Sequence, residues 1–506
     1  MTAGISGTVI APGESSPAEA DSRAAGSKPA PRGPRPRPTV LTRRYWNTPR
    51  RVRALTALCL AALLTAGAVA ACVLTGARDG IDTVGHQAAP QAVRAADLSF
   101  ALSDMDAQAA NLLLIGADPD YAVLRKQTQD TYEQRRAQAD ADLQGAAEAS
   151  AHDPAGQRAV QRVFGELGQY EALVARAQLL EDQAHAPAAK PPAAALDTYR
   201  QATDLLRQQL LPAADQVTAA NAGSVDQVYQ AQRGDLAAGW WWVLATGLLA
   251  LLALAALQRM LAVSFRRLVN LPLAAVTLLT ALALAATLTL TSRAAQHLLV
   301  AKSNAYDSVI ALSRARATAY DMNADESRYL IDPDRAAAYQ QSFFDKSQSI
   351  VHLDGTDLAG YNAALAAAVR AHAANRADVP FAGFLGTELR NITFGGEQQA
   401  ADRTLNAFQT YQVDDRKIRD LRNQGRLKDA VTLDTGNAPG QSDADFELFS
   451  SALGDVLTIN QRAMDQAVAD ADGDLGAGPA VGGALALAAA LALTVLAVRP
   501  RLREYR

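Results

Sequence analysis

Four long apolar stretches divide this chain. None of them contains a charged side chain, and they cover residues 54–75, 236–258, 268–292 and 475–498. A helix of about 20 apolar residues can cross a bilayer, because its backbone N–H and C=O groups pair within the helix. Buried helices of soluble proteins rarely run so long without a charge. The pattern therefore predicts an all-α integral membrane protein with four transmembrane helices at these positions.

Arginine residues flank the apolar stretches in three segments. They are Arg43, Arg44, Arg50, Arg51 and Arg53, then Arg259, Arg266 and Arg267, and finally Arg499, Arg501, Arg503 and Arg506. Short segments rich in Arg and Lys stay on the cytoplasmic side of a membrane. We therefore expect residues 1–53, 259–267 and 499–506 to be cytoplasmic, so that both termini lie inside the cell. Residues 76–235 and 293–474 are then two domains outside the plasma membrane.

The charge distribution agrees with this topology. The three arginine-rich segments together carry +13, so the net charge of −4 for the whole chain leaves −17 for the remainder. An acidic exterior without a basic stripe and interleaved aromatic residues is not expected to bind nucleic acid. The cytoplasmic arginines are instead placed to contact the anionic heads of membrane lipids.

The segment before the first apolar stretch has the composition of a solvated tail. Ala, Ser, Gly and Pro dominate it, and Pro alternates with Arg from Pro31 to Pro38. Because so few large apolar side chains cannot offset the entropy lost on ordering, we expect residues 1–53 to be a disordered basic tail. A second interpretation of the Pro-Arg run is a docking segment for a protein that binds proline-rich peptides.

The two cysteines, Cys59 and Cys72, both lie in the first apolar stretch. The exterior domains therefore contain no disulfide and depend on packing for their stability. The string Val69-Ala70-Ala71-Cys72 loosely resembles the lipidation signal of bacterial lipoproteins. An uncleaved membrane anchor agrees better with the long basic segment before this string, but the sequence does not decide whether Cys72 is lipidated.

The first exterior domain, residues 76–235, has apolar residues three and four positions apart, such as Leu98, Leu102 and Met105. This spacing is typical of amphipathic helices. Helix-breaking residues cluster at 116–119, 152–156 and 185–192. They separate four helices, of which the first continues from one span and the last runs into the next. We therefore expect an up-down-up-down four-helix bundle standing on the membrane.

The second exterior domain, residues 293–474, repeats this plan. Asp104-Met105 and Asp118-Pro119-Asp120 reappear as Asp321-Met322 and Asp332-Pro333-Asp334. In the second domain the Asp-Pro-Asp motif follows the Asp-Met motif three residues sooner, which predicts that the first helix of the second bundle is three residues shorter. In both triplets we expect the Asp to cap a helix that starts at Pro. The alternative is chance similarity between two Ala-rich helices.

Two segments of the second domain are not plainly helical. Residues 379–397 combine aromatic and apolar side chains with four glycines, which predicts an ordered loop packed by its own side chains. Residues 433–442 also form an irregular stretch, with Ser442 or Asp443 available to cap the last bundle helix.

No residue pattern in the chain indicates catalysis. The six histidines are scattered, and neither a glycine-rich phosphate loop nor a nucleophile elbow occurs. We therefore expect no enzyme activity and no bound metal or cofactor. The spans carry no charge, which disfavours a transporter. Recognition outside the cell and a message to the inside remain as the expected function.

The second domain contains an ordered series of motifs. They are Phe384 to Glu397, Phe408, Tyr411, Asp415-Arg416, Ile418-Arg419, Leu421, Gly425, Pro439 to Ser442 and Asn460. With the four-span layout, this series resembles the GlnX-type membrane proteins of actinobacteria. The paired bundles also resemble, more generally, the four-helix sensor modules of chemoreceptors and histidine kinases. Gly395 stands where the GlnX-type family tends to have Pro, which leaves the backbone of that loop freer.

The resemblance implies a non-enzymatic adaptor that senses amino-acid supply. In that family a solute-binding lipoprotein for glutamate, aspartate or glutamine is recognised outside, and a cytoplasmic Ser/Thr kinase, protein kinase G, responds inside. A direct small-molecule receptor with its ligand between bundle helices is one alternative. A structural accessory subunit of a transporter is another. The oligomeric state does not follow from the sequence.

Candidate partner-binding residues fall into two groups. The first group lies in the loops far from the membrane, which a bulky partner reaches most easily. Its members are Asp118, Asp120, Asp332, Asp334, Gly440, Gln441 and Ser442. The second group is Asn391, Thr393, Phe394 and Glu397. These residues belong to a loop that either closes the bundle near the membrane or contacts a ligand directly.

Overall fold

The computed structural model describes residues 48–149, 154–265 and 270–503. Within these ranges 88% of the residues are helical and no strand is present, although an isolated β-bridge joins His352 and Ala382. The predicted all-α class is confirmed. The expectations for residues 1–47, which include the Pro-Arg run, and for part of the loop after the second span, residues 266–269, lie outside the described residues.

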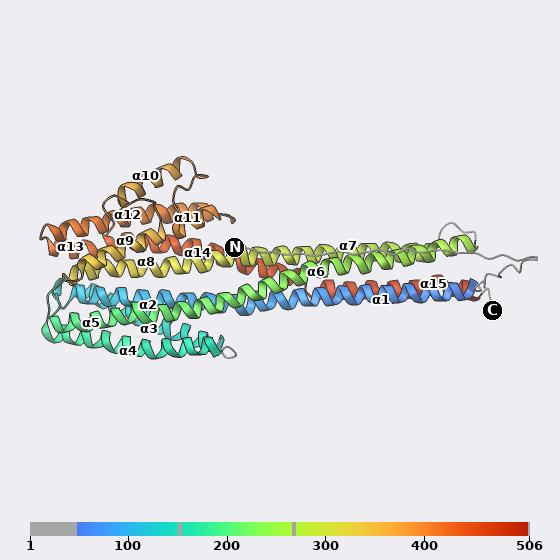
Figure 1. Ribbon diagram of the computed structural model, residues 1–506, viewed down its shortest axis with the longest axis horizontal. Helices are drawn as coiled ribbons and strands as arrows, with labels where there is room; N and C mark the ends of the chain where they lie inside the picture. The colour runs from blue at the N-terminus through green and yellow to red at the C-terminus, as the bar shows by residue number, and fades with distance from the viewer. Residues whose placement is uncertain (1–47, 150–153, 266–269, 504–506) are drawn as a thin grey trace, which may run out of the picture. The chain divides into compact units, whose positions relative to one another are not determined.

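In the described part of the chain, four long helical runs each join an apolar stretch to a bundle helix (Figure 1). They are α1 (Thr48–Ile81), η1 (Asp82–Ala88) and α2 (Ala89–Ile115); α5 (Ala193–Leu205), η3 (Leu206–Leu210) and α6 (Leu211–Phe265); α7 (Leu271–Leu299), η4 (Val300–Tyr306) and α8 (Asp307–Ile331); and α14 (Ser442–Asp474) with α15 (Ala477–Arg503). The segments η1, η3 and η4 are π-helical turns. The fourth run is interrupted at Leu475 and Gly476.

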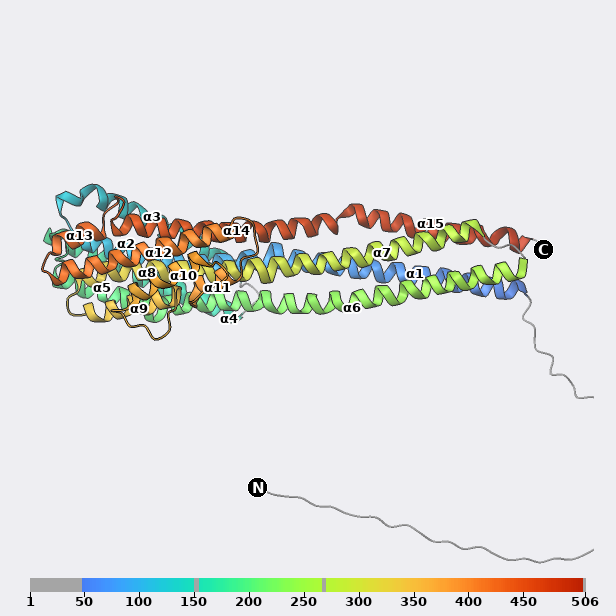
Figure 2. The same cartoon turned by 90° about the horizontal axis from the view of Figure 1, so that it is seen from above.

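All four runs are long and apolar enough to cross a membrane. Their apolar parts pack together through side chains such as Leu63 of α1, Leu254 of α6 and Val276 of α7. Other large apolar side chains of the same parts face outward, for example Leu252 and Leu485, which are 68% and 66% exposed. This combination is expected for helices surrounded by lipid and indicates a multi-pass membrane protein. Figure 2 shows α1, α6, α7 and α15 running together in this region.

The first bundle contains α2, α3 (Ala122–Ala149), α4 (Pro154–Ala184) and the run from α5 into α6. Its core includes Leu102, Met105, Leu143, Tyr170 and Leu206, all of them fully buried. The chain leaves the spans along α2, returns along α3, leaves again along α4 and returns through α5 and α6 (Figure 1). Its connections therefore have the up-down-up-down order.

The second bundle is larger than its counterpart. Its long helices are α8, α9 (Ala336–Ile350), α12 (Glu397–Asn423) and α14, and its short additions are α10 (Tyr361–Ala374), α11 (Gly383–Arg390) and α13 (Leu427–Asp434). Aromatic rings fill the core, where the centroid of Phe446 lies 4.8 Å from Tyr320 and 5.2 Å from Tyr411. Aromatic pairs at such separations stabilise a core beyond the area that they bury.

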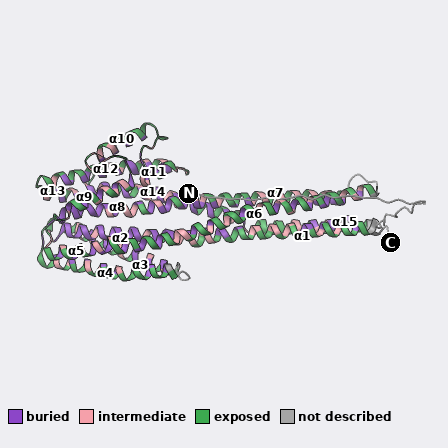
Figure 3. Cartoon of the chain, viewed as in Figure 1, coloured by how far each residue is buried: buried purple, intermediate pink, exposed green. Residues whose placement is uncertain are grey.

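The two bundles pack side by side through α2 and α8, which are the equivalent first helices of the two repeats. Figure 3 shows both helices as largely buried in this region. The π-helical turns correspond as well, since η1 begins at Asp82 and η4 at Val300. Measured back from the Asp-Met pair of each domain, these two starting positions differ by a single residue. A shared irregularity of this kind supports an internal repeat over chance similarity of composition.

The expectation that the first helix of the second bundle is shorter by three residues is wrong. α2 ends at Ile115 and α8 ends at Ile331. Counted from the Asp-Met pair of each domain, the end of α8 comes only one residue earlier than the end of α2. The other two residues are lost from the connection, where Gly116 and Ala117 of the first bundle have no counterpart. Each residue turns a helix by about 100°. Residues removed from a helix would rotate its buried face, whereas residues removed from the connection leave that face unchanged.

The loop expected at residues 379–397 contains a helix. α11 occupies Gly383–Arg390 and buries Leu385 and Leu389, which are four positions apart. Gly383 has a φ of +82°, a conformation that glycine adopts readily because it lacks a Cβ. The glycine therefore directs the chain into a helix that composition alone had disfavoured.

Candidate functional site between the two bundles

Charged side chains lie buried where α2, α5 and α8 meet. Arg328, in the last turn of α8, is completely buried. Its guanidinium contacts Asp106 of α2 and donates to Asp325 at 2.6 Å and to Asp321 at 3.1 Å. Its Nε donates to the hydroxyl of Tyr199 in α5 at 3.3 Å. One side chain thus connects helices of both bundles.

Two further cations neutralise this cluster. Lys346 of α9 lies 2.6 Å from both Asp321 and Asp325, and Arg207 of η3 lies 3.6 Å from Asp325. With Arg328, three cations therefore face the three carboxylates. Burial raises the pKa of Asp321, but the charges of Lys346 and Arg328 outweigh it and hold this pKa below its usual value. The network favours the packing in which every charge has a partner.

The predicted binding residue Asp332 belongs to the same interface. It is 1% exposed, and both of its carboxylate oxygens accept hydrogen bonds from Arg200 of α5. Burial raises the pKa of Asp332, but Arg200 outweighs it and lowers this pKa overall. Arg200 also donates to Asp334 at 3.0 Å, and the side chain of Asp334 is 82% exposed. The expectation that both carboxylates lie at an accessible tip is therefore wrong for Asp332.

The helix start predicted at Pro333 is also wrong. α9 begins at Ala336, with Arg335 as its N-cap. Asp332 accepts from the backbone N–H of Arg335 at 3.3 Å and so caps the preceding turn. Arg200 also donates to both oxygens of Asp332, so this carboxylate joins the turn before α9 to the other bundle.

The corresponding tip of the first bundle is closer to expectation. Asp118 accepts from the backbone N–H of Asp120 at 3.0 Å, and Pro119 opens the short 3-10 helix η2 (Pro119–Tyr121). Asp120 forms an ion pair at 3.1 Å with Lys428 of α13, and both of these side chains are mostly exposed. This tip therefore presents carboxylates to the surroundings and also touches the second bundle.

The tip before α14 is held by hydrogen bonds within the second bundle. Gly440 has a φ of +84°, and Gln441 accepts from the backbone N–H of Ala438 at 2.9 Å. α14 begins at Ser442 with Gln441 as its N-cap, so the expected cap by Ser442 or by the following Asp is wrong. The buried Ser442 hydroxyl instead donates to Glu326 of α8, at 3.1 Å.

The Ser442 hydroxyl lies among carboxyls whose pKa values are raised. Glu326 also accepts from the hydroxyl of Tyr411 at 2.7 Å. Burial, with help from the charge of Asp434, raises the pKa of Glu326 well above its usual value. Burial likewise raises the pKa of Asp443 to about 7. Burial therefore favours the protonated forms of Glu326 and Asp443, whereas the cations beside Asp321 favour its ionised form.

The loop before α12 closes the bundle on itself. Glu397 is fully buried, and its Oε2 accepts from the backbone N–H groups of Thr393 at 2.6 Å and Phe394 at 2.9 Å. Its Oε1 accepts from Asn460 of α14 at 2.8 Å. Asn391 donates to a serine hydroxyl of α8 at 3.1 Å. These contacts favour the closing role over direct ligand contact, except that Phe394 also lines a groove near the spans.

The buried network around Arg328 is the feature that sequence reasoning missed. Asp321, Asp325 and Arg328 are four and three positions apart, so they share one face of a helix. Asp106 directly follows Met105, which belongs to the apolar stripe of α2. Charges on or beside an apolar stripe signal buried ion pairs, but this signal does not name the partners.

The comparisons with known proteins add one finding. Residues 80–230 match the family model described as the actinobacterial sensor domain. These residues run from the end of α1 through the first bundle into α6. No curated protein matches the chain. Together with the four apolar helices, the match supports an actinobacterial membrane sensor.

Proposed function

We propose that this protein is a non-enzymatic adaptor that relays amino-acid availability across the plasma membrane. The observation that carries the proposal is the continuity of the spans with the bundle helices. Helical segments reach from the spans to the far end at Arg50–Ile115, Ala193–Val263, Leu271–Ile331 and Ser442–Pro500. A displacement at the far end can therefore travel along packed helices to the opposite ends of the spans.

In the proposed orientation, the bundles lie outside and the arginine-rich ends lie in the cytoplasm. The input is a solute-binding lipoprotein loaded with glutamate, aspartate or glutamine, which docks on the far end of the bundles. The exposed carboxylates of Asp120 and Asp334 support docking there, because both lie beside the contact between bundles. The output is a cytoplasmic Ser/Thr kinase that contacts the basic tail. The resemblance of the second bundle to GlnX-type proteins supports both partners.

The packing of α2 against α8 is the equilibrium that such a partner can shift. A partner shifts a packing equilibrium only by its difference in affinity for the two packings, typically about 1–3 kcal/mol of coupling. Docking across Asp120 of one bundle and Asp334 of the other would change how the bundles slide past each other. The ion pairs around Arg328 limit the slide to arrangements in which the charges remain partnered.

The test is binding to the full chain in lipid nanodiscs. The bundles should not be separated, because separation strips Arg328 of its partner Asp106. We expect the amino-acid-loaded binding protein to bind more tightly than the empty form. Replacing Asp120 and Asp334 together with Asn should weaken this binding about tenfold, since ion pairs of exposed carboxylates contribute about 0.2–1 kcal/mol each.

The matched control replaces two exposed carboxylates near the spans, Asp235 and Asp465, with Asn and should leave binding unchanged. Two results contradict the proposal. One is the absence of binding to the unmodified protein in its loaded form. The other is direct binding of free glutamate, aspartate or glutamine at comparable strength, which identifies a direct receptor instead.

A further inference from the structure

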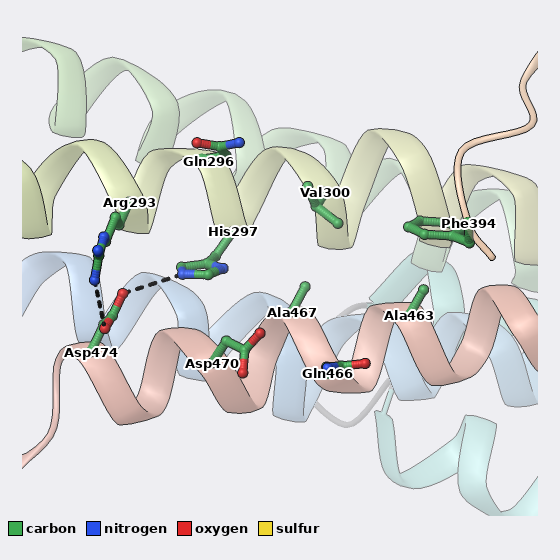
Figure 4. Close-up of a pocket in the computed structure, with 10 residues that line it drawn as sticks. All are labelled: Arg293, Gln296, His297, Val300, Phe394, Ala463, Gln466, Ala467, Asp470 and Asp474. Atoms are coloured by element: carbon green, nitrogen blue, oxygen red, sulfur yellow. Dashed lines mark hydrogen bonds and ion pairs between the residues drawn. The ribbon is translucent and has the colours of Figure 1, made fainter.

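A groove lies where the second bundle meets the spans. It has a volume of about 590 Å³ and runs between α7 with η4 on one side and α14 on the other. The lining residues that give the groove its charges and its apolar surface include Arg293, His297, Val300, Phe394, Asp470 and Asp474. Figure 4 shows Arg293 at one end and the ring of Phe394 at the other. The groove is independent of the far end at which a protein partner is proposed to dock.

The end with Arg293 lies at the level of phospholipid headgroups. Arg293 directly follows the apolar stretch at residues 268–292, and Asp474 directly precedes the stretch at residues 475–498. The border of a hydrophobic span is where the bilayer's polar region begins. Trp241 of α6, 66% exposed, lies at the matching end of its own apolar stretch, as expected for an aromatic residue at the membrane interface.

The polar groups of the groove are arranged by charge. The Arg293 guanidinium is 3.6 Å from Asp474, and the His297 Nε2 is 3.3 Å from the same carboxylate. The Arg293 side chain is 60% exposed, so its remaining N–H groups are accessible. Asp470 lies one helical turn from Asp474, and its carboxylate points into the gap between the helices (Figure 4). Within the described residues, no hydrogen bond or ion pair to the Asp470 side chain is found.

We propose that this groove binds the headgroup of an ethanolamine phospholipid. The guanidinium of Arg293, at the headgroup level, receives the phosphate, because Arg donates several N–H groups to phosphate oxygens. The primary ammonium, two carbons further on, donates to Asp470 and Asp474. Val300 and the alanines of α14 lie beyond Asp470 toward Phe394, so that this end of the groove is apolar (Figure 4).

The charges of the groove discriminate against the other common headgroups. A glycerol headgroup carries the phosphate but no cation, so it leaves Asp470 unpaired and adds negative charge beside Asp474. A choline headgroup carries a cation without N–H groups, so it cannot donate to either carboxylate. Choline is usually held by a cage of several aromatic rings, whereas Phe394 is the aromatic residue that lines this groove.

The experiment uses the full chain, purified in detergent without added lipid. Short-chain phosphatidylethanolamine, phosphatidylcholine and phosphatidylglycerol with the same acyl chains are titrated, and bound lipid is counted by native mass spectrometry. We expect the ethanolamine lipid to bind at least about tenfold more tightly than the other two. Asp470→Asn, at an exposed position, should remove this preference, whereas Arg293→Gln should weaken the binding of all three lipids, because each of them carries a phosphate. Asp465→Asn, on the same helix but outside the groove, should keep it.

Equal affinity for the three lipids overturns the proposal, as does a preference that survives Asp470→Asn or a binding strength that Arg293→Gln leaves unchanged. Free glycerophosphoethanolamine, which has the same charged groups without acyl chains, distinguishes the source of the ligand. We expect it to bind too weakly to compete at millimolar concentration. If it displaces the lipid, the site serves a soluble compound and the assignment to a membrane lipid is overturned.

Discussion

Arg328 illustrates how one side chain can join two domains. Its guanidinium is completely buried and is surrounded by carboxylates that come from α2 and from α8 itself. Removing one partner from a buried ion pair destabilises a protein by roughly 3–5 kcal/mol, because the other charge remains buried without compensation. An exposed arginine has no such effect.

Replacing Arg328 with Met should therefore lower the free energy of unfolding of the bundles by roughly 3–5 kcal/mol. Denaturant unfolding of the full chain, followed by circular dichroism, measures this change. Arg370→Met, at an exposed position of α10, should change stability by less than about 0.5 kcal/mol. Adding Asp106→Asn to Arg328→Met should recover part of the loss, since the two residues are coupled. Equal effects of the two single substitutions would contradict the buried network.

Glu388 should make stability depend on pH near neutrality. Burial, assisted by the neighbouring Glu397, raises its pKa from 4.5 to about 8. The folded protein therefore keeps a proton that the unfolded chain releases above about pH 4.5. This contribution to stability is fully present below that pH and is lost as the pH rises toward 8.

Glu388→Gln keeps the size of the side chain and removes its titration. We expect the variant to lose less stability than the unmodified protein between pH 5 and 8, by a few kcal/mol at most. Melting temperatures across this range provide the measurement. Glu148→Gln, at an exposed position of α3, should leave the pH dependence unchanged. The assignment is wrong if Glu388→Gln has the same pH dependence as the unmodified protein.

Individual residues differ in how far the sequence predicts their place. The exposure of Asp334 follows from its position in a turn. The burial of Asp332, two residues earlier, depends on Arg200, which is 132 residues away in the chain. No local pattern contains that information, because the contact exists only once the two bundles have packed.

Among the helices, α11 depends most visibly on a single backbone conformation. Gly383 has a φ of +82°, and a Cβ built there would lie 2.8 Å from the carbonyl oxygens of Ser349 and Ile350. Both obstacles are backbone atoms, which cannot move aside as the end of a side chain can. α11 carries Glu388 and packs against α9 and α12, so a shift at its start affects the bundle core.

Gly383→Ala should destabilise the second bundle by about 1–3 kcal/mol, through both the left-handed backbone and the clash. Gly395→Ala is the matched control, because a Cβ at Gly395 meets no atom within 4 Å and its φ is not positive. The control should be neutral or slightly stabilising. Thermal unfolding of both variants separates the two cases, and equal melting temperatures would contradict the role given to Gly383.

Long helices could be predicted from the sequence because their signal is local and repeated. The apolar periodicity of α2 and the charge-free stretches of the spans each extend over many residues, so a single exception does not hide them. The short α11 could not be predicted, since four glycines in and beside it lower its helix propensity. Its formation depends on burying Leu385 and Leu389 against the neighbouring helices, which is a tertiary effect.

For the whole molecule, the placement of arginines predicts which side of the membrane each region occupies. In a background without Cys59 and Cys72, a single cysteine at Ser349 should react with a membrane-impermeant thiol reagent in intact cells. Ser349 is exposed on α9, so the folded bundle does not block the reaction. A cysteine at Ser264, beside the arginine-rich loop, should react only after the membrane is permeabilised. Reaction at Ser264 in intact cells would reverse the proposed topology.

The arrangement of two bundles against each other is the part of the architecture that the sequence did not reveal. The repeat of Asp-Met and Asp-Pro-Asp motifs predicted two similar units, but not that their first helices pack together. That contact requires the charges of Asp106 and Arg328 to meet across 222 residues of sequence. Some of the binding residues predicted from their position in loops are therefore accessible carboxylates, and others are buried at the interface.

The π-helical turns η1 and η4 set the rotational phase between membrane and bundle. Both lie just beyond a span. Their hydrogen bonds join residues five positions apart, one more than in an α-helix, so each π-helical turn adds one residue to its helical run. One residue corresponds to about 100° of rotation, so the lipid-facing stripe and the core-facing stripe of one run need not be collinear. Converting such a turn to regular α-helix, without unfolding anything, would rotate a bundle helix relative to its own span.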